Sequence, residues 1–409
     1  MTSAQSTATV TPGDIQSAAA NIAGLVRKTS CQHSMTLSAI LGAEIYIKFE
    51  SEQFTAAFKE RGALNKLLSL TSEQKRLGVI AMSAGNHAKA VAWHAQKLNI
   101  PATIVMPRHT PNVKVEDTRR FGATVVLEGV RLDEAAEHAK RLASECGLTM
   151  IHPYDDPMVI AGQGTVALEM LEQVPELDVL VVPVGGGGLI AGMACIAKSI
   201  KPGIEVIGVQ CSQYPAVKNR LSGQAHSPVA GVTIAEGIAV KTPGENTLKC
   251  IEQWVDEILL VSEEEIDEAI YLYLNIEKTV AEGAGAVALA AVRAERERFA
   301  GKKVGLVLSG ANIDARTLST ILMRNLARSG LIVQLQIASN DTPGALADIA
   351  GHIGRFGANI LEVSHQRTFT RVCIRETLLN VMIEVKDRHD TAKLIDVLRK
   401  ANYSVELLP

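Results

Sequence analysis

The sequence has 409 residues, enough for two or three domains with substantial hydrophobic cores. It is 47% hydrophobic and 21% charged with a formal net charge of -3, so it lacks the basic excess of a nucleic-acid-binding protein. The longest apolar run, 189–197, is too short to cross a membrane. The six cysteines show no CxxC pairing, and residues 1–11 resemble neither a signal nor a transit peptide. We expect a cytoplasmic globular protein with a flexible N-terminal segment.

From about residue 14 to 326 the sequence alternates between strand-like and helix-like segments. The strand-like segments are rich in valine and isoleucine and apolar on both faces, which is typical of buried parallel strands. A helix-like segment, 131–146, is stopped by Gly147. This pattern predicts an α/β fold of open sheets with helices on both faces. The predicted strands are 44–49, 78–82, 102–106, 124–127, 179–182, 205–209 and 303–308.

Lys59 lies just after an apolar run and at the start of a predicted helix. A lysine becomes a nucleophile when it is withdrawn from water or placed near positive charge, because its pKa then falls. Phe58 and the alanines before it supply apolar surroundings, and we expect Arg61 to supply the charge. Taken alone, a solvated lysine at a helix start is the commoner outcome.

Four glycines, Gly185 to Gly188, follow a buried strand and precede a helix of small residues. Backbone amides free of side chains converge on an anion there, and the helix N-terminus adds partial positive charge. A dinucleotide is the competing guest, since Gly186, Gly188 and Ala191 match GxGxxA. That motif needs an acidic residue at the end of the next strand, where this chain has Gln210. The loop therefore predicts a site for a single phosphate.

Two more loops follow predicted strands. In the first, Ser83 to His87, backbone amides would hold a carboxylate and Asn86 would reach a ring hydroxyl; Asn86 as a plain helix cap is the alternative. In the second, Ser309 is either a turn residue or a partner for a ring nitrogen. All these groups lie at the carboxyl ends of strands, where open α/β sheets bind ligands. A lysine, a phosphate loop, a carboxylate loop and ring-directed polar groups together predict a pyridoxal phosphate site.

Around residue 330 the character of the sequence changes, and 331–409 reads as a second domain. Its predicted elements follow the βαββαβ order of a ferredoxin-like fold. Thr342 is expected to cap the first helix, with Pro343 at its first position. The expected strands are 331–337, 359–369, 376–386 and 403–408, and the second helix is 391–401.

The order of six motifs resembles the threonine dehydratase branch of the fold-type II pyridoxal phosphate enzymes. The motifs are AAFKERGALNKL, SAGNHAKAVA, GQGTVALEML, PVGGGGLIAG, AEGAGA and LSGANID. The resemblance implies a tryptophan synthase β-like catalytic domain over 14–326, with a small subdomain inserted at about 50–155. Residues 331–409 are similar to a single ACT regulatory domain, through Asn340 to Leu346 and Gly357 to Ile360.

The resemblance also implies a role for each site residue. Lys59 would bind the cofactor covalently and then act as the general base, with Phe58 packed beside it. The cofactor's 3-hydroxyl would contact Asn86, and its pyridine nitrogen would face Ser309. The remaining contacts would be made by the phosphate loop, Gly185, Gly186, Gly187, Gly188 and Leu189, and by the substrate-carboxylate loop, Ser83, Ala84, Gly85, Asn86 and His87.

The sequence departs from the family pattern in informative places. Ala56 and Ala57 replace a glycine and a serine, which leaves the substrate range open. Ala84 stands where serine racemases carry a second proton-transferring serine, so elimination is favoured over racemisation. Gln210 and Ala216 replace the carboxylates that bind a divalent cation in racemases, so we expect no metal there. A monovalent ion near Glu282 stays open.

The resemblance implies β-elimination of L-threonine to 2-oxobutanoate and ammonia, with L-serine giving pyruvate as a side activity. Serine racemase or dehydratase, hydroxyaspartate ammonia-lyase and an amino-acid sensor without catalysis are the alternatives. The ACT-like domain would bind a branched-chain amino acid through Asp341, Gly344 and Asn359, or serve only to join subunits. A homodimer or homotetramer and a place in isoleucine biosynthesis or threonine catabolism are expected.

Overall fold

The computed structural model describes residues 10–224, 231–366 and 375–408. The chain forms two compact units, residues 1–313 and 314–409. Each unit has its own sheets and its own hydrophobic core.

A six-stranded sheet forms the centre of the first unit, in the order β1-β2-β10-β7-β8-β9. All neighbouring pairs are parallel except the edge pair β1 and β2. All five residues of β7 are buried, as expected for a strand covered on both faces. The strands are β1 (Cys31–His33), β2 (Glu44–Phe49), β7 (Val179–Pro183), β8 (Glu205–Cys211), β9 (Glu257–Val261) and β10 (Lys303–Leu308).

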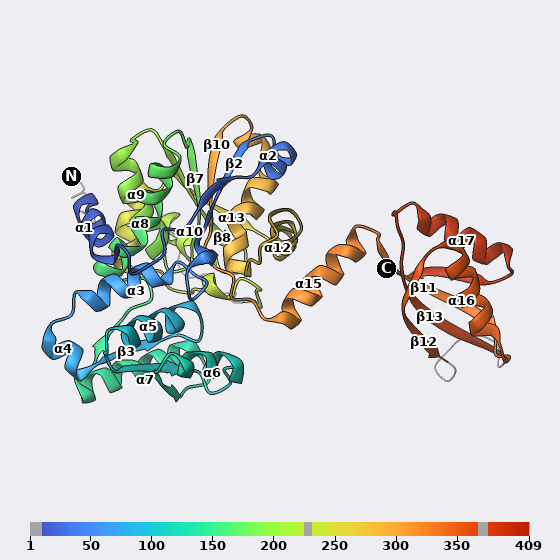
Figure 1. Ribbon diagram of the computed structural model, residues 1–409, viewed down its shortest axis with the longest axis horizontal. Coiled ribbons are helices and arrows are strands. Elements are labelled where there is room, and N and C mark those ends of the chain that lie inside the picture. Colours follow the sequence, from blue (N-terminus) through green and yellow to red (C-terminus); the bar gives the residue numbers. More distant parts are fainter. Residues whose placement is uncertain (1–9, 225–230, 367–374, 409) are drawn as a thin grey trace. The chain divides into compact units, whose positions relative to one another are not determined.

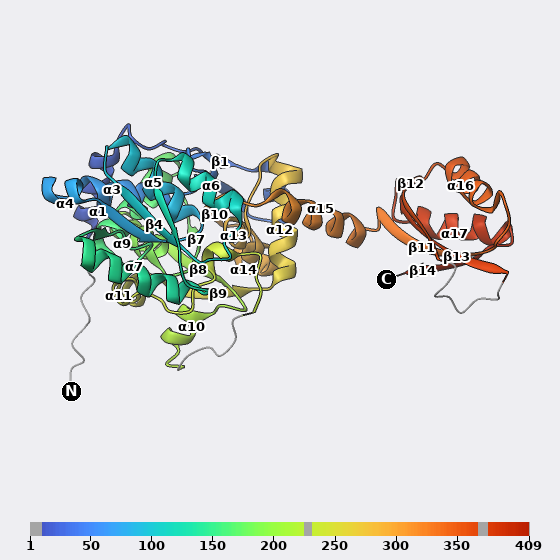
Figure 2. The same ribbon diagram turned by 90° about the horizontal axis from the view of Figure 1, so that it is seen from below.

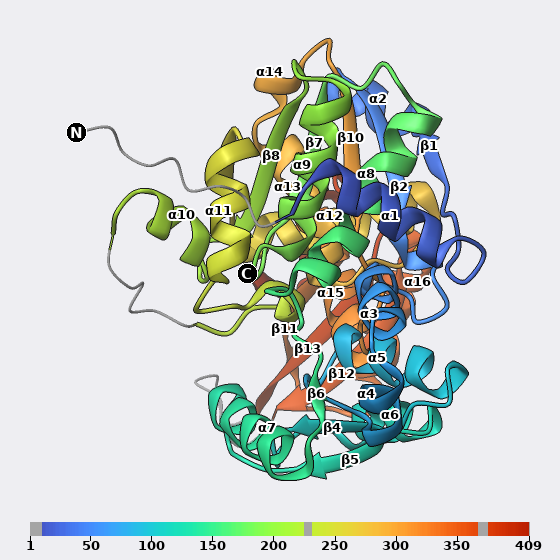
Figure 3. The same ribbon diagram turned by 90° about the vertical axis from the view of Figure 1, so that its left-hand side faces the viewer.

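Helices cover both faces of this sheet, as predicted. α8 and α9 lie against one face with α1 outside them, and α13 and α12 lie on the other (Figure 1, Figure 3). The helices of this part are α1 (Pro12–Ile22), α2 (Met35–Leu41), α8 (Pro157–Gln173), α9 (Gly188–Ile200), α10 (Ala216–Leu221), α11 (Glu245–Trp254), α12 (Glu263–Glu277), α13 (Gly283–Ala294) and α14 (Arg296–Phe299), with 3-10 turns η1 (Glu50–Glu52) and η2 (Glu236–Ile238).

A second, fully parallel sheet in the order β5-β4-β3-β6 forms a smaller part of the same unit. Successive residues of β3 face opposite sides: Val79 and Ala81 pack in the core beneath α5, and Ile80 packs with Ala135 of α7. α3 packs on α5, which covers the smaller sheet, and on α8, which covers the six-stranded sheet, so it connects the two parts of the unit. The elements are β3 (Val79–Met82), β4 (Ala102–Met106), β5 (Thr124–Leu127), β6 (Thr149–Met150), α3 (Lys59–Leu68), α4 (Ser72–Leu77), α5 (Asn86–Lys97), α6 (Asn112–Arg120) and α7 (Leu132–Cys146).

The second unit begins with α15 (Ala315–Arg328) and continues in the predicted βαββαβ order. Its antiparallel sheet has the order β12-β13-β11-β14. The two helices that come after β11 in the chain, α16 and α17, pack in one core on one face of this sheet (Figure 2). The elements are β11 (Ile332–Asn340), α16 (Ala345–Phe356), β12 (Asn359–Gln366), β13 (Glu376–Glu384), α17 (Asp390–Lys400) and β14 (Ser404–Leu408).

Several expectations need correction. Val10 is buried in the core and Thr11 caps α1, so order begins before residue 14; residues 1–9 of the expected flexible segment lie outside the described residues. Thr342 does not cap α16, because the chain turns once more and Gly344, with φ of 94°, becomes the N-cap. β12 agrees with the expected strand 359–369 as far as Gln366, and residues 367–369 lie outside the described residues.

Three strands were not predicted from the sequence. β1 and β6 have three and two residues, which is too short for a periodic pattern, and β9 is an edge strand with an exposed leucine. The boundary expected at 326 falls inside α15, which groups with the second unit.

Candidate functional site

Lys59 is the first residue of α3, and the segment before it runs along the end of β10. The Phe58 amide donates to the Ser309 carbonyl at 3.1 Å, and the Ala311 amide donates to the Ala56 carbonyl at 2.9 Å. Between these bonds Ala57 forms an isolated antiparallel bridge with Gly310. Two loops that are far apart in the sequence thus meet, and Lys59 and Ser309 come together.

The amine of Lys59 is held within the protein. It donates to the Pro153 carbonyl at 2.7 Å and lies 5.1 Å from the centre of the Phe58 ring. Burial lowers the pKa of Lys59 to about 8, against the opposing negative charge of Glu282. A neutral amine is therefore accessible near neutral pH, as a nucleophile requires.

The expectation that Arg61 lowers this pKa is wrong. The fully buried Arg61 guanidinium pairs with Glu50 at 2.7 Å and with Glu169 at 2.6 Å, so its charge is neutralised there. Burial would raise the pKa of Glu50, but its pairing with Arg61 outweighs this and holds it below its usual range. The pKa of Lys59 falls because of withdrawal from water.

The glycine loop forms the N-terminus of α9. Among the described residues none accepts a hydrogen bond from the amides of Gly185 to Leu189. A Cβ on Gly186 would lie 2.3 Å from the Tyr154 ring, and one on Gly188 would lie 2.9 Å from the Tyr154 carbonyl oxygen. Tyr154 follows Pro153, which holds the Lys59 amine, so lysine and glycine loop are neighbours. Free amides, a helix N-terminus and no side chains fit a phosphate.

Asn86 begins α5, but it does not cap this helix. Gly85 is the N-cap, and the Asn86 side chain instead donates to Glu282 at 2.6 Å and accepts from Asn312 at 2.7 Å. The helix-cap alternative for Asn86 is therefore wrong. Its amide lies in a polar cluster beside the loop of Ser309 and Gly310.

The sequence pointed to Glu282 only as a residue near a monovalent ion. Burial raises its pKa to about 7, although the bonds from the Asn86 side chain and the Asn312 backbone lower it. A Cβ on Gly310 would lie 2.4 Å from the Glu282 carboxylate, so a larger residue here would push Glu282 away. A carboxylate directly before a run of glycines and alanines was the available signal.

Some of the amides in the loop expected to bind the substrate carboxylate, residues 83–87, already have partners within the protein. The Ser83 amide donates to the Val105 carbonyl and the Gly85 amide to the Ser83 hydroxyl, both at 3.2 Å. The amides of Ala84, Asn86 and His87 have no acceptor among the described residues. An anion at this loop thus has three free donors.

The imidazole of His87 is buried beneath this loop. Burial and the charge of Lys59 lower its pKa to about 3, so the ring is neutral at pH 7. Its Nε2 lies 2.8 Å from the Ile151 carbonyl and is therefore the protonated nitrogen.

Ser309 is buried at the end of β10, with its hydroxyl 3.4 Å from the Ala284 carbonyl. A hydroxyl that donates there keeps its lone pairs for a second partner. Gln210, which decided against a dinucleotide, is also buried. Its side-chain oxygen accepts from the Val217 and Lys218 amides at 3.1 Å, so it is occupied in holding α10.

A family model described as "Pyridoxal-phosphate dependent enzyme" matches residues 22–310. An L-threonine ammonia-lyase of Thermotoga maritima is 43% identical over 98% of this chain and 100% of its own length. The chain belongs to the pyridoxal-phosphate dependent enzyme family. Like other members of this family, it depends on pyridoxal phosphate.

Other family members agree with this assignment. A catabolic L-threonine dehydratase of Staphylococcus aureus is 42% identical over 78% of this chain and 93% of its own. The solved processed form of threonine deaminase isoform 2 from Solanum lycopersicum has a TM-score of 0.71 at 36% identity, covering 76% of this chain and 86% of that one. Maize serine racemase has a TM-score of 0.73 at 34% identity, covering 78% and 98%.

The residues present fit the family's cofactor. Lys59 is an amine with a lowered pKa, and the amides from Gly185 to Leu189 are free beside it. Asn86 and Ser309 would face the ring of the bound cofactor. No helix among the described residues is long and apolar enough to span a membrane.

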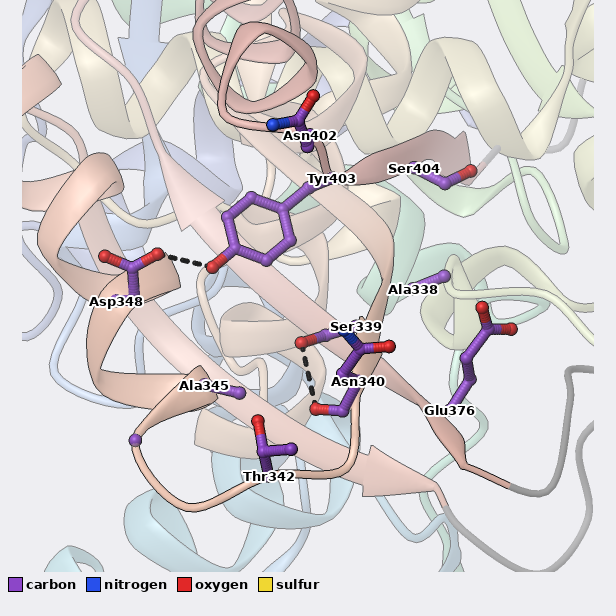
Figure 4. Close-up of a pocket in the computed structure, with 11 residues that line it drawn as sticks. Ala338, Ser339, Asn340, Thr342, Ala345, Asp348, Glu376, Asn402, Tyr403 and Ser404 are labelled. Atoms are coloured by element: carbon purple, nitrogen blue, oxygen red, sulfur yellow. Dashed lines mark hydrogen bonds between the residues drawn. The ribbon is translucent and has the colours of Figure 1, made fainter.

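The second unit contains a cavity of about 380 Å³ between the start of α16 and the start of β14 (Figure 4). The Tyr403 hydroxyl donates to Asp348 at 2.5 Å across one side of it. Of the three residues expected to be regulatory, Gly344 lines the cavity, and Asp341 and Asn359 are not among its lining residues. The lining residues are Ala338, Ser339, Asn340, Thr342, Gly344, Ala345, Asp348, Glu376, Asn402, Tyr403 and Ser404.

Proposed function

We propose that this protein is a threonine ammonia-lyase that converts L-threonine to 2-oxobutanoate and ammonia, with L-serine giving pyruvate as a side activity. The observation that carries the proposal is the Lys59 amine, whose pKa is lowered to about 8, next to the glycine loop. Relatives that match almost the whole chain and are named L-threonine ammonia-lyase support the choice of substrate.

The residues of the site divide the work. Bound pyridoxal phosphate would supply an electron sink for the charge that develops at the substrate's α-carbon. Lys59 would hold the cofactor, and its neutral amine would take the α-proton of the substrate as general base. The free amides of Ala84, Asn86 and His87 would bind the substrate carboxylate. The α-proton and the β-hydroxyl leave together as one water, and one water is taken up again when the enamine product hydrolyses to 2-oxobutanoate and ammonia.

Ala84 restricts the reaction to one face. Racemisation needs a proton donor on the face opposite the lysine, and a methyl group transfers no proton. Serine racemases resemble this chain at 34% and 36% identity, so racemisation is the alternative that must be tested. Ala84 is the observation that favours elimination.

The test of this proposal follows 2-oxo acid formation from L-threonine, L-serine and 3-hydroxyaspartate, together with D-serine formation from L-serine. We expect threonine to be the best substrate and D-serine to be absent. Lys59→Ala is expected to abolish turnover and the absorbance of the bound cofactor, because no other amine replaces it. Lys66→Ala on the same helix is the control and retains both. Turnover by Lys59→Ala, or D-serine as the main product, would contradict the proposal.

We also infer that the second unit is an ACT-like regulatory domain whose cavity binds a branched-chain amino acid. The amides at the N-terminus of α16, from Gly344 on, suit a carboxylate, and Asp348 and Glu376 suit an ammonium group. Such domains would pair in a homodimer or homotetramer. Inhibition by isoleucine would place the enzyme in isoleucine biosynthesis, and its absence would favour catabolism; a cytoplasmic location is part of this proposal.

A further inference from the structure

Asn312 follows β10 in the first unit, and its side chain is engaged at every polar atom. Its Nδ2 donates to the Thr55 carbonyl at 2.8 Å and to Asn86 Oδ1 at 2.7 Å. Its Oδ1 accepts from the Lys89 ammonium at 3.2 Å. One side chain thus joins the lysine segment, the start of α5 and the loop after β10.

These partners determine which way both amides point. A carbonyl only accepts and an ammonium only donates, so Thr55 and Lys89 place Asn312 Nδ2 and Oδ1 without ambiguity. Asn312 Nδ2 then donates a hydrogen bond to Asn86, which accepts it with its side-chain oxygen. The Nδ2 of Asn86 is left to donate to Glu282 at 2.6 Å and, with its second hydrogen, to a ligand.

Lys89 extends the arrangement to α6. Its ammonium also pairs with Asp117 at 3.0 Å, and the two side chains are 17% and 32% exposed. This ion pair holds the ammonium in place on the far side of Asn312. The order of contacts is therefore Asp117, Lys89, Asn312, Asn86 and Glu282.

We propose that Asn312 is a positioning residue: with Lys89 behind it, it orients the Asn86 amide so that an N–H faces the cofactor's ring oxygen. The inference rests on the proposed role of Asn86 beside the cofactor. Without Asn312, only the bond to Glu282 still orients the Asn86 amide, so the amide is held less firmly and its N–H is less well aimed at the ring oxygen. Asn312 acts through Asn86 and does not itself touch the cofactor.

A double-mutant cycle tests this route. The dissociation constant of pyridoxal phosphate from the apo protein is measured for the wild type and for Asn86→Ala, Asn312→Ala and the double variant. Losing one oriented hydrogen bond should weaken binding about tenfold in Asn312→Ala. In the Asn86→Ala background the same change should have an effect of less than about twofold, because the residue it orients is gone.

Spectra and kinetics separate positioning from mere stabilisation of the fold. Asn312→Ala should shift the absorbance band of the bound cofactor and lower kcat for threonine more than it changes KM. Lys89→Met should act in the same direction, about threefold on cofactor binding, and it serves as the second variant if Asn312→Ala does not fold. The control is Asn219→Ala, which removes the side-chain amide of a residue in α10, and it should match the wild type.

Additive losses in the cycle, or an Asn312→Ala protein with unchanged affinity and spectrum, would overturn the inference. A fall in melting temperature of apo Asn312→Ala with unchanged cofactor binding would do so as well. If the wild-type protein itself bound no pyridoxal phosphate, the proposed function would fail instead, so the two failures are distinguishable.

Discussion

Two residues of the lysine segment have unusual local environments. Ala56 has φ of 57°, in the left-handed region that residues with a side chain avoid, and glycine is the residue that adopts it without strain. Lys59, three residues later, is a cation withdrawn from water. Both features lie where the segment bends against the end of β10.

Ala56→Gly is expected to stabilise the protein by about 0.5–1 kcal/mol, because relief of the left-handed strain exceeds the entropy that glycine adds to the unfolded chain. Ala57→Gly is the matched control: Ala57 is fully buried and outside the left-handed region, so losing its methyl group should destabilise. Urea unfolding of the apo proteins measures both. Equal effects at the two positions would contradict this prediction.

The lowered pKa of Lys59 predicts how pyridoxal phosphate capture depends on pH. Only the neutral amine attacks the cofactor's aldehyde, and the folded-state pKa of about 8 lies below the usual 10.5. The capture rate of the apo protein should therefore rise with pH up to about 8 and level off above it. Stopped-flow absorbance between about pH 6 and pH 10.5 checks this. A rate that still climbs steeply above pH 9 would show an ordinary lysine.

At the scale of elements, α3 is anchored by a buried ion-pair cluster. Arg61 on the first turn pairs with Glu50 of η1 and with Glu169 of α8, and Lys48 of β2 pairs with Glu169 at 2.6 Å. This cluster joins α3 to elements of the large sheet's layer. It holds the start of α3, and so Lys59, against that layer.

Arg61→Met should cost about 3–5 kcal/mol of folding free energy, because Glu50 would be left as an unpaired charge with no exposure. Lys28→Met removes an ion pair of the exposed kind, with Glu172, and should cost less than about 1 kcal/mol. Urea unfolding midpoints of the two variants give the comparison. A cost for Arg61→Met no larger than that for Lys28→Met would show that the cluster does not anchor the helix.

At the scale of the whole molecule, the chain is divided into two units. The proposed catalytic residues all fall within 1–313, and the second unit has a core of its own, built from residues 335–405. None of the proposed site residues of the first unit belongs to that core.

A chain ending at residue 313 is expected to keep threonine deamination and to lose any response to branched-chain amino acids. Activity with and without isoleucine or valine is measured for this chain and for the full-length protein. An effector response that survived in the short chain would place the effector site in the first unit. Loss of activity in a folded short chain would show that catalysis needs the second unit.

The sequence predicted the layout of this molecule well. Seven strands of the first unit, the start of α3 at Lys59 and the order of the C-terminal elements were predicted correctly, because hydrophobic periodicity and glycine stops are local properties. Short or edge strands such as β6 and β9 were missed, because their few residues carry no period. The prediction that Thr342 caps α16 was wrong, because the chain makes a further turn and the helix is capped by Gly344.

By itself, the sequence determined the fold class and predicted the glycine loop and Lys59 as the reactive lysine, since each depends on residue type and local order. Only the tertiary structure decided what surrounds that lysine. It paired Arg61 with two carboxylates and left burial to lower the lysine's pKa. It also brought Asn86, Glu282 and Asn312 together from three distant segments. Contacts between residues so far apart along the chain depend on tertiary packing, which local sequence patterns do not predict.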